Sequence, residues 1–265
     1  MVRSITVASG KGGVGKSCVS INLALTYAAS GLRVTLVDAD FGLANTHVLM
    51  GHNLRHSLRD VISGTHNVED VVATLEGGVR LLSGGTGHAD MINLNTVERQ
   101  QAIRMIQSVA KTSDLVVVDA PGGVSDATMA FAAASERVLL VMVGEPTSIM
   151  DCYTLAKVAA LDYGVRRFSC FVNMANSRRE ALEHYHKFCS AAKKFIDVEF
   201  SFAGHLPYSQ KMRQSVLDRR PLVRAHPGSL EATAFEDLAN NVFRGPVNSQ
   251  SGLSLRPNEP IAERV

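Results

Sequence analysis

One short segment near the N-terminus constrains this chain more than any other feature. Residues 9–17 read Ser-Gly-Lys-Gly-Gly-Val-Gly-Lys-Ser, which satisfies the phosphate-loop pattern GxxxxGK followed by Ser or Thr. The segment follows an apolar run at residues 5–8 and opens a helical pattern, which is the context that the motif requires. Its glycines let successive backbone N–H groups face one concavity, and the N-terminus of the helix adds partial positive charge. The segment therefore predicts a polyphosphate site.

Two side chains of this loop have expected roles toward a bound nucleotide. Lys16 is expected to reach the β and γ phosphates, and the Ser17 hydroxyl is expected to ligate Mg²⁺. The residues of the loop expected to contact the nucleotide are Gly10, Lys11, Gly12, Gly13, Val14, Gly15, Lys16, Ser17 and Cys18.

Strand and helix patterns alternate along the chain. Continuous apolar runs, typical of strands buried on both faces, occur at residues 5–8, 34–37, 115–118, 138–143 and 170–173. Helical patterns occupy residues 17–30, 96–111, 125–134, 148–163, 178–196 and 230–242. This alternation predicts an α/β fold with a mostly parallel, doubly wound sheet and helices on both faces. We expect one domain over residues 1–244 and a disordered tail over residues 245–265, where no apolar period continues.

The composition excludes several classes of protein. With 46% hydrophobic and 20% charged residues, the chain is globular rather than disordered. A net charge of +2 provides no global field for nucleic acid or an anionic membrane. The four cysteines form no CxxC pair, which argues against a zinc site and a disulfide framework. We see neither a signal peptide nor an apolar run long enough to span a bilayer, so we expect a cytoplasmic protein.

Lys11 distinguishes this loop from an ordinary phosphate loop. With a lysine at this early position, the segment resembles the deviant Walker A motif of the MinD/ParA family, KGGxGK followed by Ser or Thr. The resemblance covers about residues 2–243 and implies a P-loop ATPase in which Lys11 reaches the nucleotide of a partner subunit, so that ATP joins a homodimer. The alternative is a solvated lysine that contacts its own nucleotide. The residues expected to act in catalysis are Asp40, Lys11 and Lys16.

Carboxylates follow two further predicted strands. Residues 36–45 resemble the switch I pattern DxDxxxxN of the family, with Asp38, Asp40 and Asn45 at its fixed positions. Because the carboxyl ends of parallel strands converge on one crevice, Asp40 is placed to orient or deprotonate the attacking water and Asp38 to hold Mg²⁺ through a water. Both aspartates could instead cap the next element.

The third nucleotide motif is a buried strand that ends in an acidic residue and a glycine pair, residues 114–123. It reads as Walker B with a switch II, in which Asp119 holds Mg²⁺ through water and Gly122 moves its N–H toward a γ-phosphate. Contacts with the γ-phosphate would order Asp40, Asn45 and Gly122.

Two residues after later strands are expected near the base. In the family, the residues matching Asn173 and Pro207 flank the adenine, and the Asn amide reads the base edge. The resemblance thus implies that the nucleotide is ATP, bound with Mg²⁺, although Asn at the end of a strand is also a common turn residue.

The FlhG/FleN branch of the family is the most similar. Residues 145–153, Glu-Pro-Thr-Ser-Ile-Met-Asp-Cys-Tyr, and the pattern of residues 208–242 resemble that branch. The branch implies regulation of flagellar number or placement, with a protein partner in the flagellar or polar machinery that recruits the chain to the pole or to the inner face of the membrane. Members of the branch often carry a DQAxxLR-like helix before the first strand that stimulates the GTPase FlhF. The sequence given starts at its first strand, so stimulation of FlhF is not expected. The tail lacks a basic amphipathic helix, so direct membrane binding is not expected.

Two rival functions remain open. Residues 178–224 hold ten basic residues against five acidic ones, which fits a ParA-like partition ATPase that binds DNA nonspecifically. A metabolic P-loop enzyme is the other rival, although a metal-cluster carrier would need a paired-cysteine motif. Among the nine histidines, His52 and His56 lie in the loop-rich stretch after switch I and are expected to be solvated, while His184 and His186 would diverge on a helix.

Overall fold

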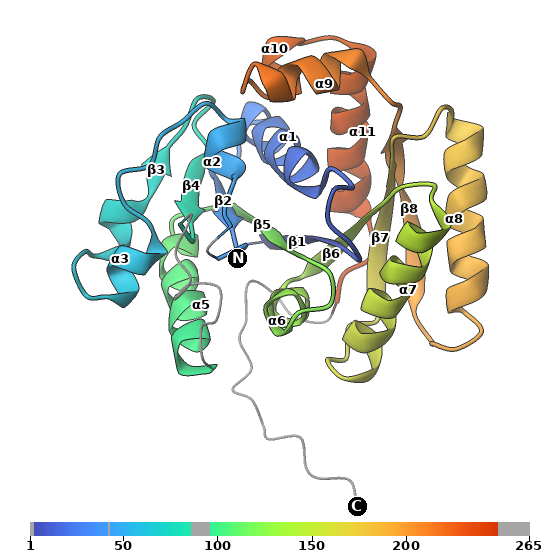
Figure 1. Cartoon of the computed structure of the whole chain (residues 1–265), viewed down its shortest axis with the longest axis horizontal. Coiled ribbons are helices and arrows are strands. Elements are labelled where there is room, and N and C mark those ends of the chain that lie inside the picture. Colours follow the sequence, from blue (N-terminus) through green and yellow to red (C-terminus); the bar gives the residue numbers. More distant parts are fainter. Residues whose placement is uncertain (1–2, 42, 86–95, 249–265) are drawn as a thin grey trace, which may run out of the picture.

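The apolar runs pair side by side in one sheet of eight strands, in the order β3-β4-β2-β5-β1-β6-β7-β8. The computed structural model describes residues 3–41, 43–85 and 96–248 (Figure 1). Only β3 and β4 pair antiparallel among the described strands, so the mostly parallel sheet that the alternation predicts is confirmed. The strands are β1 Arg3–Ser9, β2 Val34–Asp38, β3 Ala73–Thr74, β4 Arg80–Ser83, β5 Leu115–Gly122, β6 Arg137–Met142, β7 Arg167–Asn173 and β8 Glu199–Leu206.

Helices cover both faces of this sheet, as expected (Figure 1). Helices α1 and α11 pack on one face, and α5, α6, α7 and α8 pack on the other. The described helices are α1 Lys16–Ala29, α2 Thr46–Leu49, α3 Leu58–Ile62, the 3₁₀ helix η1 Val68–Val71, α5 Thr96–Ala110, α6 Asp126–Ala134, α7 Pro146–Leu161, α8 Arg178–Ala192, α9 Gln210–Leu217, α10 Leu222–Ala225 and α11 Leu230–Arg244.

The central strands are largely apolar because each faces a core on both sides, although Ser4 and Thr6 of β1 and Thr35 of β2 are buried polar residues within them. In β5, Leu115 and Val117 belong to the core under α1 and α11, whereas Val116 and Val118 belong to the core under α5 and α6. Successive side chains of a strand point to opposite faces, so a strand covered on both faces is mostly hydrophobic. The acidic residues Asp38 and Asp119 lie toward the carboxyl ends of β2 and β5.

The six helical patterns of the sequence correspond to α1, α5, α6, α7, α8 and α11, with ends that differ by a few residues. Serine side chains set the start of three of them, because Ser125, Ser177 and Ser229 each accept a hydrogen bond from the backbone N–H three residues further along the chain. The short elements α2, α3, α9, α10, β3 and β4 had no counterpart among the predicted ones. No described helix has the length and hydrophobicity that crossing a bilayer would take.

The described chain continues a few residues past the predicted end of the domain at residue 244. The Asn248 side chain accepts hydrogen bonds from the N–H groups of Arg166 and Arg167, and its own backbone N–H donates to the Glu136 carbonyl. Residues 245–248 therefore lie against the start of β7. The rest of the predicted tail, residues 249–265, lies outside the described residues.

Candidate functional site

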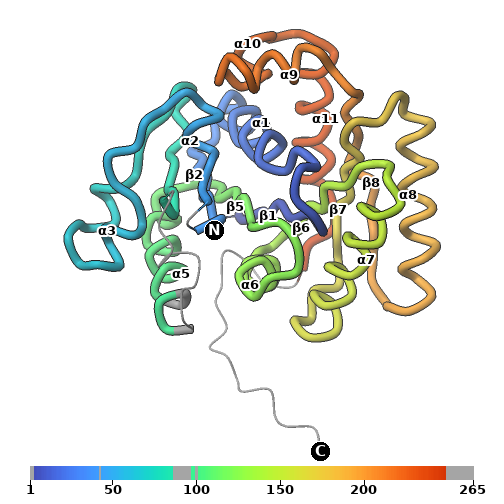
Figure 2. The backbone as a smooth tube through the Cα atoms, in the orientation of Figure 1, coloured from blue at the N-terminus to red at the C-terminus, as the bar shows by residue number. Residues whose placement is uncertain are grey.

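The phosphate loop joins the end of β1 to the start of α1, at the centre of the sheet (Figure 2). At Gly10 the loop packs tightly against the backbone of α7. A Cβ on Gly10 would lie 2.1 Å from the carbonyl carbon of Asp151 and 2.4 Å from the nitrogen of Cys152. Gly15, just before α1, has a φ of 85°, in the left-handed region that favours glycine. Glycine at these two positions is therefore required by packing and by backbone conformation, beyond any contact with a ligand.

The lysine of the loop is buried against the acidic end of β5. Lys16 Nζ lies 2.7 Å from Asp119 Oδ1, and the two side chains are 9% and 1% exposed. The Ser20 hydroxyl, one turn further along α1, donates to the same carboxylate oxygen at 2.9 Å. The parallel register of β2 with β5 sets Asp38 beside Asp119. The structure thus brings together the cation predicted for the phosphates and the carboxylates predicted for the metal.

Asp38 organises the backbone of switch I. Its carboxylate accepts hydrogen bonds from the N–H groups of Asp40, Asn45 and Thr46 and from the Thr46 hydroxyl. Asp38 therefore caps α2, in line with the capping alternative, and its contact with Mg²⁺ stays a prediction. Burial, followed by the charge of Asp119, raises the pKa of Asp38 to about 6. A second positive charge in this site would stabilise the ionised carboxylate.

Asp40 and Gly122 lie where the two switches meet the loop. Burial raises the pKa of the half-buried Asp40, and the charge of Lys16 opposes that rise. A carboxylate with a raised pKa is better suited to accept a proton from water than a strongly acidic one. A Cβ on Gly122 would lie 3.3 Å from the Gly12 nitrogen, so switch II directly adjoins the phosphate loop.

Lys11 and Lys16 have different partners. Lys11 Nζ lies 2.5 Å from Glu145 Oε2, just before α7, and 3.4 Å from the Thr147 hydroxyl. Lys11 is 31% exposed and Glu145 is 64% exposed, so this pair is at the surface. The loop therefore carries one lysine in the buried acidic site and one at its exposed rim.

The two residues predicted to flank the base, Asn173 and Pro207, line a cavity of about 260 Å³ beside the loop. Gly15, Cys18, Asn173 and Pro207 all contribute to its wall. Burial raises the pKa of the Cys18 thiol to about 11, so the wall there is neutral. The cavity can accept a flat, largely apolar group next to the phosphate loop.

Asn173 has intramolecular partners at both ends of its amide. Its Nδ2 donates to the Val14 carbonyl at 2.8 Å, and its Oδ1 accepts from the Met174 N–H at 3.0 Å. The side chain thus ties β7 to the phosphate loop, a role that its position in the sequence does not reveal. Reading of a base edge by this amide stays a prediction.

The sequence reasoning missed the far wall of the cavity. Side chains of α9 and the segment before it complete the cavity: Tyr208, Ser209, Met212, Arg213, Val216 and Leu217. The sequence signal for α9 was a serine, Ser209, followed by apolar residues four apart, Met212 and Val216. In the structure, the Ser209 hydroxyl accepts a hydrogen bond from the Met212 N–H at the start of α9.

The basic excess of residues 178–224 is divided between two places. Part of it lies on α8 and part on α9 and α10, which Figure 1 shows at different sides of the molecule. Several of its members have acidic partners, including Arg179 with Glu183 and Lys211 with Glu231. The basic residues of this segment therefore lie on separate elements, and some of them are paired with acidic residues.

Comparisons with known proteins show the family of the chain and its fold. The ParA family, described as NUBPL iron-transfer P-loop NTPase, matches residues 1–243. The chain is 38% identical to the antiactivator FleN of Pseudomonas aeruginosa, over 93% of this chain and 88% of that protein. It is 28% identical to the flagellum site-determining protein YlxH of Helicobacter pylori, over 89% of this chain and 80% of that protein. The structure matches the septum site-determining protein MinD of Pyrococcus horikoshii, complexed with Mg-ADP, with a TM-score of 0.75 at 26% identity, covering 92% of this chain and 97% of that one.

Proposed function

The chain belongs to the ParA/MinD family of P-loop NTPases and hydrolyses ATP, and on that basis we propose that it is a switch that dimerises with ATP and regulates the number or placement of flagella. The cellular part of the proposal is supported by the names of two relatives, the antiactivator FleN and the flagellum site-determining protein YlxH. The molecular part is supported by the residues of the loop and switches.

The residues of the site fit ATP with Mg²⁺. Lys16 and the N–H groups of the loop would hold phosphate oxygens, and Ser17, Asp38 and Asp119 would hold the metal, directly or through water. A bound Mg²⁺ would neutralise phosphate charge. The buried carboxylates of Asp38 and Asp119 lie side by side in register, an arrangement that favours a cation between the switches. Gly15, Cys18, Asn173 and Pro207 would surround the base.

In turnover, Asp40 would orient the attacking water and accept its proton. Its raised pKa fits that role, and the hydrogen bond from its N–H to Asp38 couples its position to the metal site. Gly122 would donate its N–H to the terminal phosphate. Asn45 would become ordered together with Asp40, because the N–H groups of both donate to the Asp38 carboxylate. Loss of the terminal phosphate would release both switches from this arrangement.

The observation that best supports an ATP-dependent dimer is the position of Lys11. Its ammonium pairs at the exposed rim with Glu145, whereas that of Lys16 is buried against Asp119. A cation at the rim can reach across a twofold interface to the phosphates of a second subunit, and the symmetry would form two such contacts at once. The dimer would present a surface to a protein of the flagellar or polar machinery. That partner would recruit the chain from the cytoplasm to the pole or the membrane, without direct membrane binding.

The test uses Lys11→Ala and, as a matched control, Lys157→Ala, which removes an exposed lysine from α7. Lys11→Ala should bind ATP with nearly unchanged affinity and remain a monomer in analytical ultracentrifugation. The parent chain and Lys157→Ala should dimerise with ATP. Since removing one buried lysine–phosphate pair costs about 2–5 kcal/mol, removing two would move a micromolar equilibrium beyond ordinary protein concentrations. ATP-dependent dimers of Lys11→Ala would contradict the proposal, and unchanged flagellar number and placement in cells lacking the chain would contradict its cellular part.

A further inference from the structure

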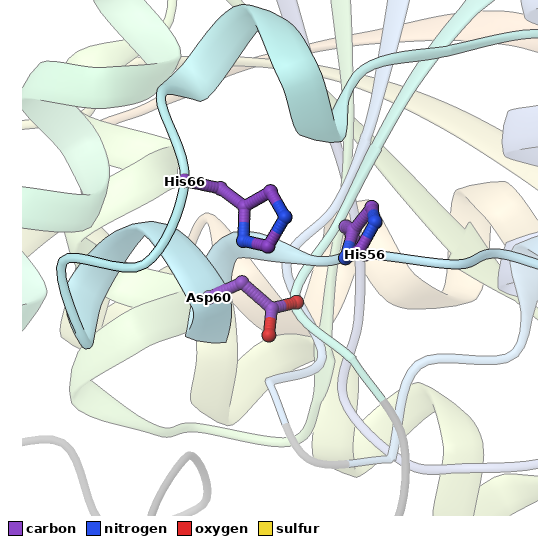
Figure 3. A group of neighbouring side chains, drawn as sticks. All are labelled: His56, Asp60 and His66. Carbon is purple, nitrogen blue, oxygen red and sulfur yellow. The ribbon is translucent and has the colours of Figure 1, made fainter.

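Three side chains around α3 converge at a distance from the nucleotide site. Within the described ranges, His56, Asp60 and His66 form the one group of at least three potential metal ligands whose ligand atoms all lie within 4.8 Å of one another. Figure 3 shows the three side chains meeting from the segment before α3, from α3 itself and from the segment after it. All three are half-buried, so His56 is only partly exposed, whereas His52 is exposed as its loop-rich surroundings predict.

The local backbone holds these residues in place. Asp60 Oδ2 accepts the Ser57 N–H at 2.7 Å, in a capping box that begins α3 just after His56. The Asp60 carbonyl accepts the N–H groups of Thr65 and His66 at 2.9 and 3.2 Å, so the chain turns back on α3 and returns His66 to the side of His56. The two imidazole rings pack with their centroids 4.0 Å apart, at 31°. The arrangement is thus built from hydrogen bonds that do not depend on a ligand.

Two imidazoles and a carboxylate are a ligand set for a borderline transition metal. Zn²⁺ is bound by histidine nitrogen and carboxylate oxygen at about 2.0–2.2 Å, and three protein ligands with an open fourth position are a common arrangement for it. Ligands at that range from one ion lie about 3.5 Å apart, so atoms within 4.8 Å need only small side-chain rotations to converge. A carboxylate whose second contact is a backbone N–H is also held in orientation, as metal-ligating carboxylates usually are.

We propose that His56, Asp60 and His66 bind one divalent transition-metal ion of the Zn²⁺ and Co²⁺ class, at a site separate from the Mg²⁺ of the nucleotide. The two sites differ in chemistry: the acidic residues of the nucleotide site offer oxygen, which suits Mg²⁺, whereas the α3 site offers two nitrogens. Bound metal would join the segments on either side of α3 and stabilise the stretch that follows switch I.

The experiment is a titration of nucleotide-free, untagged protein with Co²⁺, followed by optical absorption, and with Zn²⁺, followed by calorimetry. One ion should bind per chain, with the visible spectrum of Co²⁺ on nitrogen and oxygen ligands, and Mg²⁺ in excess should not displace it. His56→Ala and His66→Ala should each weaken binding at least about tenfold. Asp60→Asn should weaken binding too, while its side-chain oxygen can still accept the Ser57 N–H of the capping box.

His186→Ala is the matched control, because it removes an exposed histidine from α8 that lies two positions from His184. It should bind metal as the parent chain does. Circular dichroism of each variant without metal verifies the fold. His56 and His66 lie on opposite sides of α3, so the one variant keeps the test informative where the other fails to fold. Unchanged metal affinity in the folded histidine variants would overturn the proposal. A sulfur-to-cobalt charge-transfer band would overturn it as well, because it would place the ion on a cysteine.

Discussion

The glycines of the phosphate loop should differ sharply in what they contribute to the folded state without nucleotide. Gly10 has the backbone of Asp151 and Cys152 where a Cβ would be, at 2.1 and 2.4 Å. Gly12 has no atom within 4 Å of that position, and its φ is not in the left-handed region. Gly10→Ala must therefore push α7 away from the loop, whereas Gly12→Ala fits without movement.

The size of the difference follows from these contacts. Carbon atoms pack at about 3.5–4.0 Å, so Gly10→Ala requires a shift of more than about 1 Å between two backbones. Overpacking a core with flexible side chains costs about 1–3 kcal/mol, and backbone atoms can yield less, so we expect at least about 3 kcal/mol. Gly12→Ala should be neutral or stabilising by up to about 1 kcal/mol, because alanine restricts the unfolded chain.

The assay is thermal unfolding of the nucleotide-free protein. For a chain of this size, about 3 kcal/mol corresponds to a fall in Tm of about 6–12 °C, which should be seen for Gly10→Ala and not for Gly12→Ala. Equal effects of the two substitutions would refute the reasoning, since they would show that contact with α7 does not distinguish the two glycines.

Three further predictions concern the charged residues of the site. Lys16→Ala should weaken ATP binding by at least about 100-fold in calorimetry, because a buried phosphate would lose its cation and Asp119 its partner; unchanged affinity would remove the phosphate-loop assignment. Asp40→Ala should keep ATP affinity within a few-fold and lower steady-state turnover about 10² to 10⁴-fold. Retained turnover would show that another group positions the attacking water. Burial raises the pKa of Asp38 from 3.8 to about 6, so the folded state holds the Asp38 proton more tightly than the unfolded state does. Ionisation of Asp38 therefore opposes folding, and the free energy of unfolding should fall by up to about 3 kcal/mol on account of Asp38 as pH rises from about 4 to 6. Urea unfolding should show a flatter pH dependence over that range for Asp38→Asn than for the parent chain, and equal slopes would contradict the expectation.

Local chemistry allowed the sequence alone to predict the longer elements of this protein and a polyphosphate site between its first strand and first helix. The strand, loop and helix of residues 5–30 follow from the apolar period and from glycines whose spacing suits a phosphate. The acidic ends of the second and fifth strands could be assigned to the same crevice, because parallel strands end at one edge. The longer helices were predictable because several turns establish a period. Those with few turns, such as α2, α3 and α10, establish none, and a strand of two residues such as β3 cannot alternate.

The tertiary structure alone decided which side chains meet. Asn173 is 159 positions from Val14 and Lys11 is 134 from Glu145, yet each pair is in hydrogen-bond contact. No local pattern encodes such a distance, because it depends on the order of strands in the sheet and on where each connecting helix begins. The same holds at short range for His56 and His66. The sequence suggests two loop residues, and only the turn after α3 brings their imidazole rings into contact. The sequence shows which reactive side chains the protein has, and the packing of helices and strands determines which of those side chains act together.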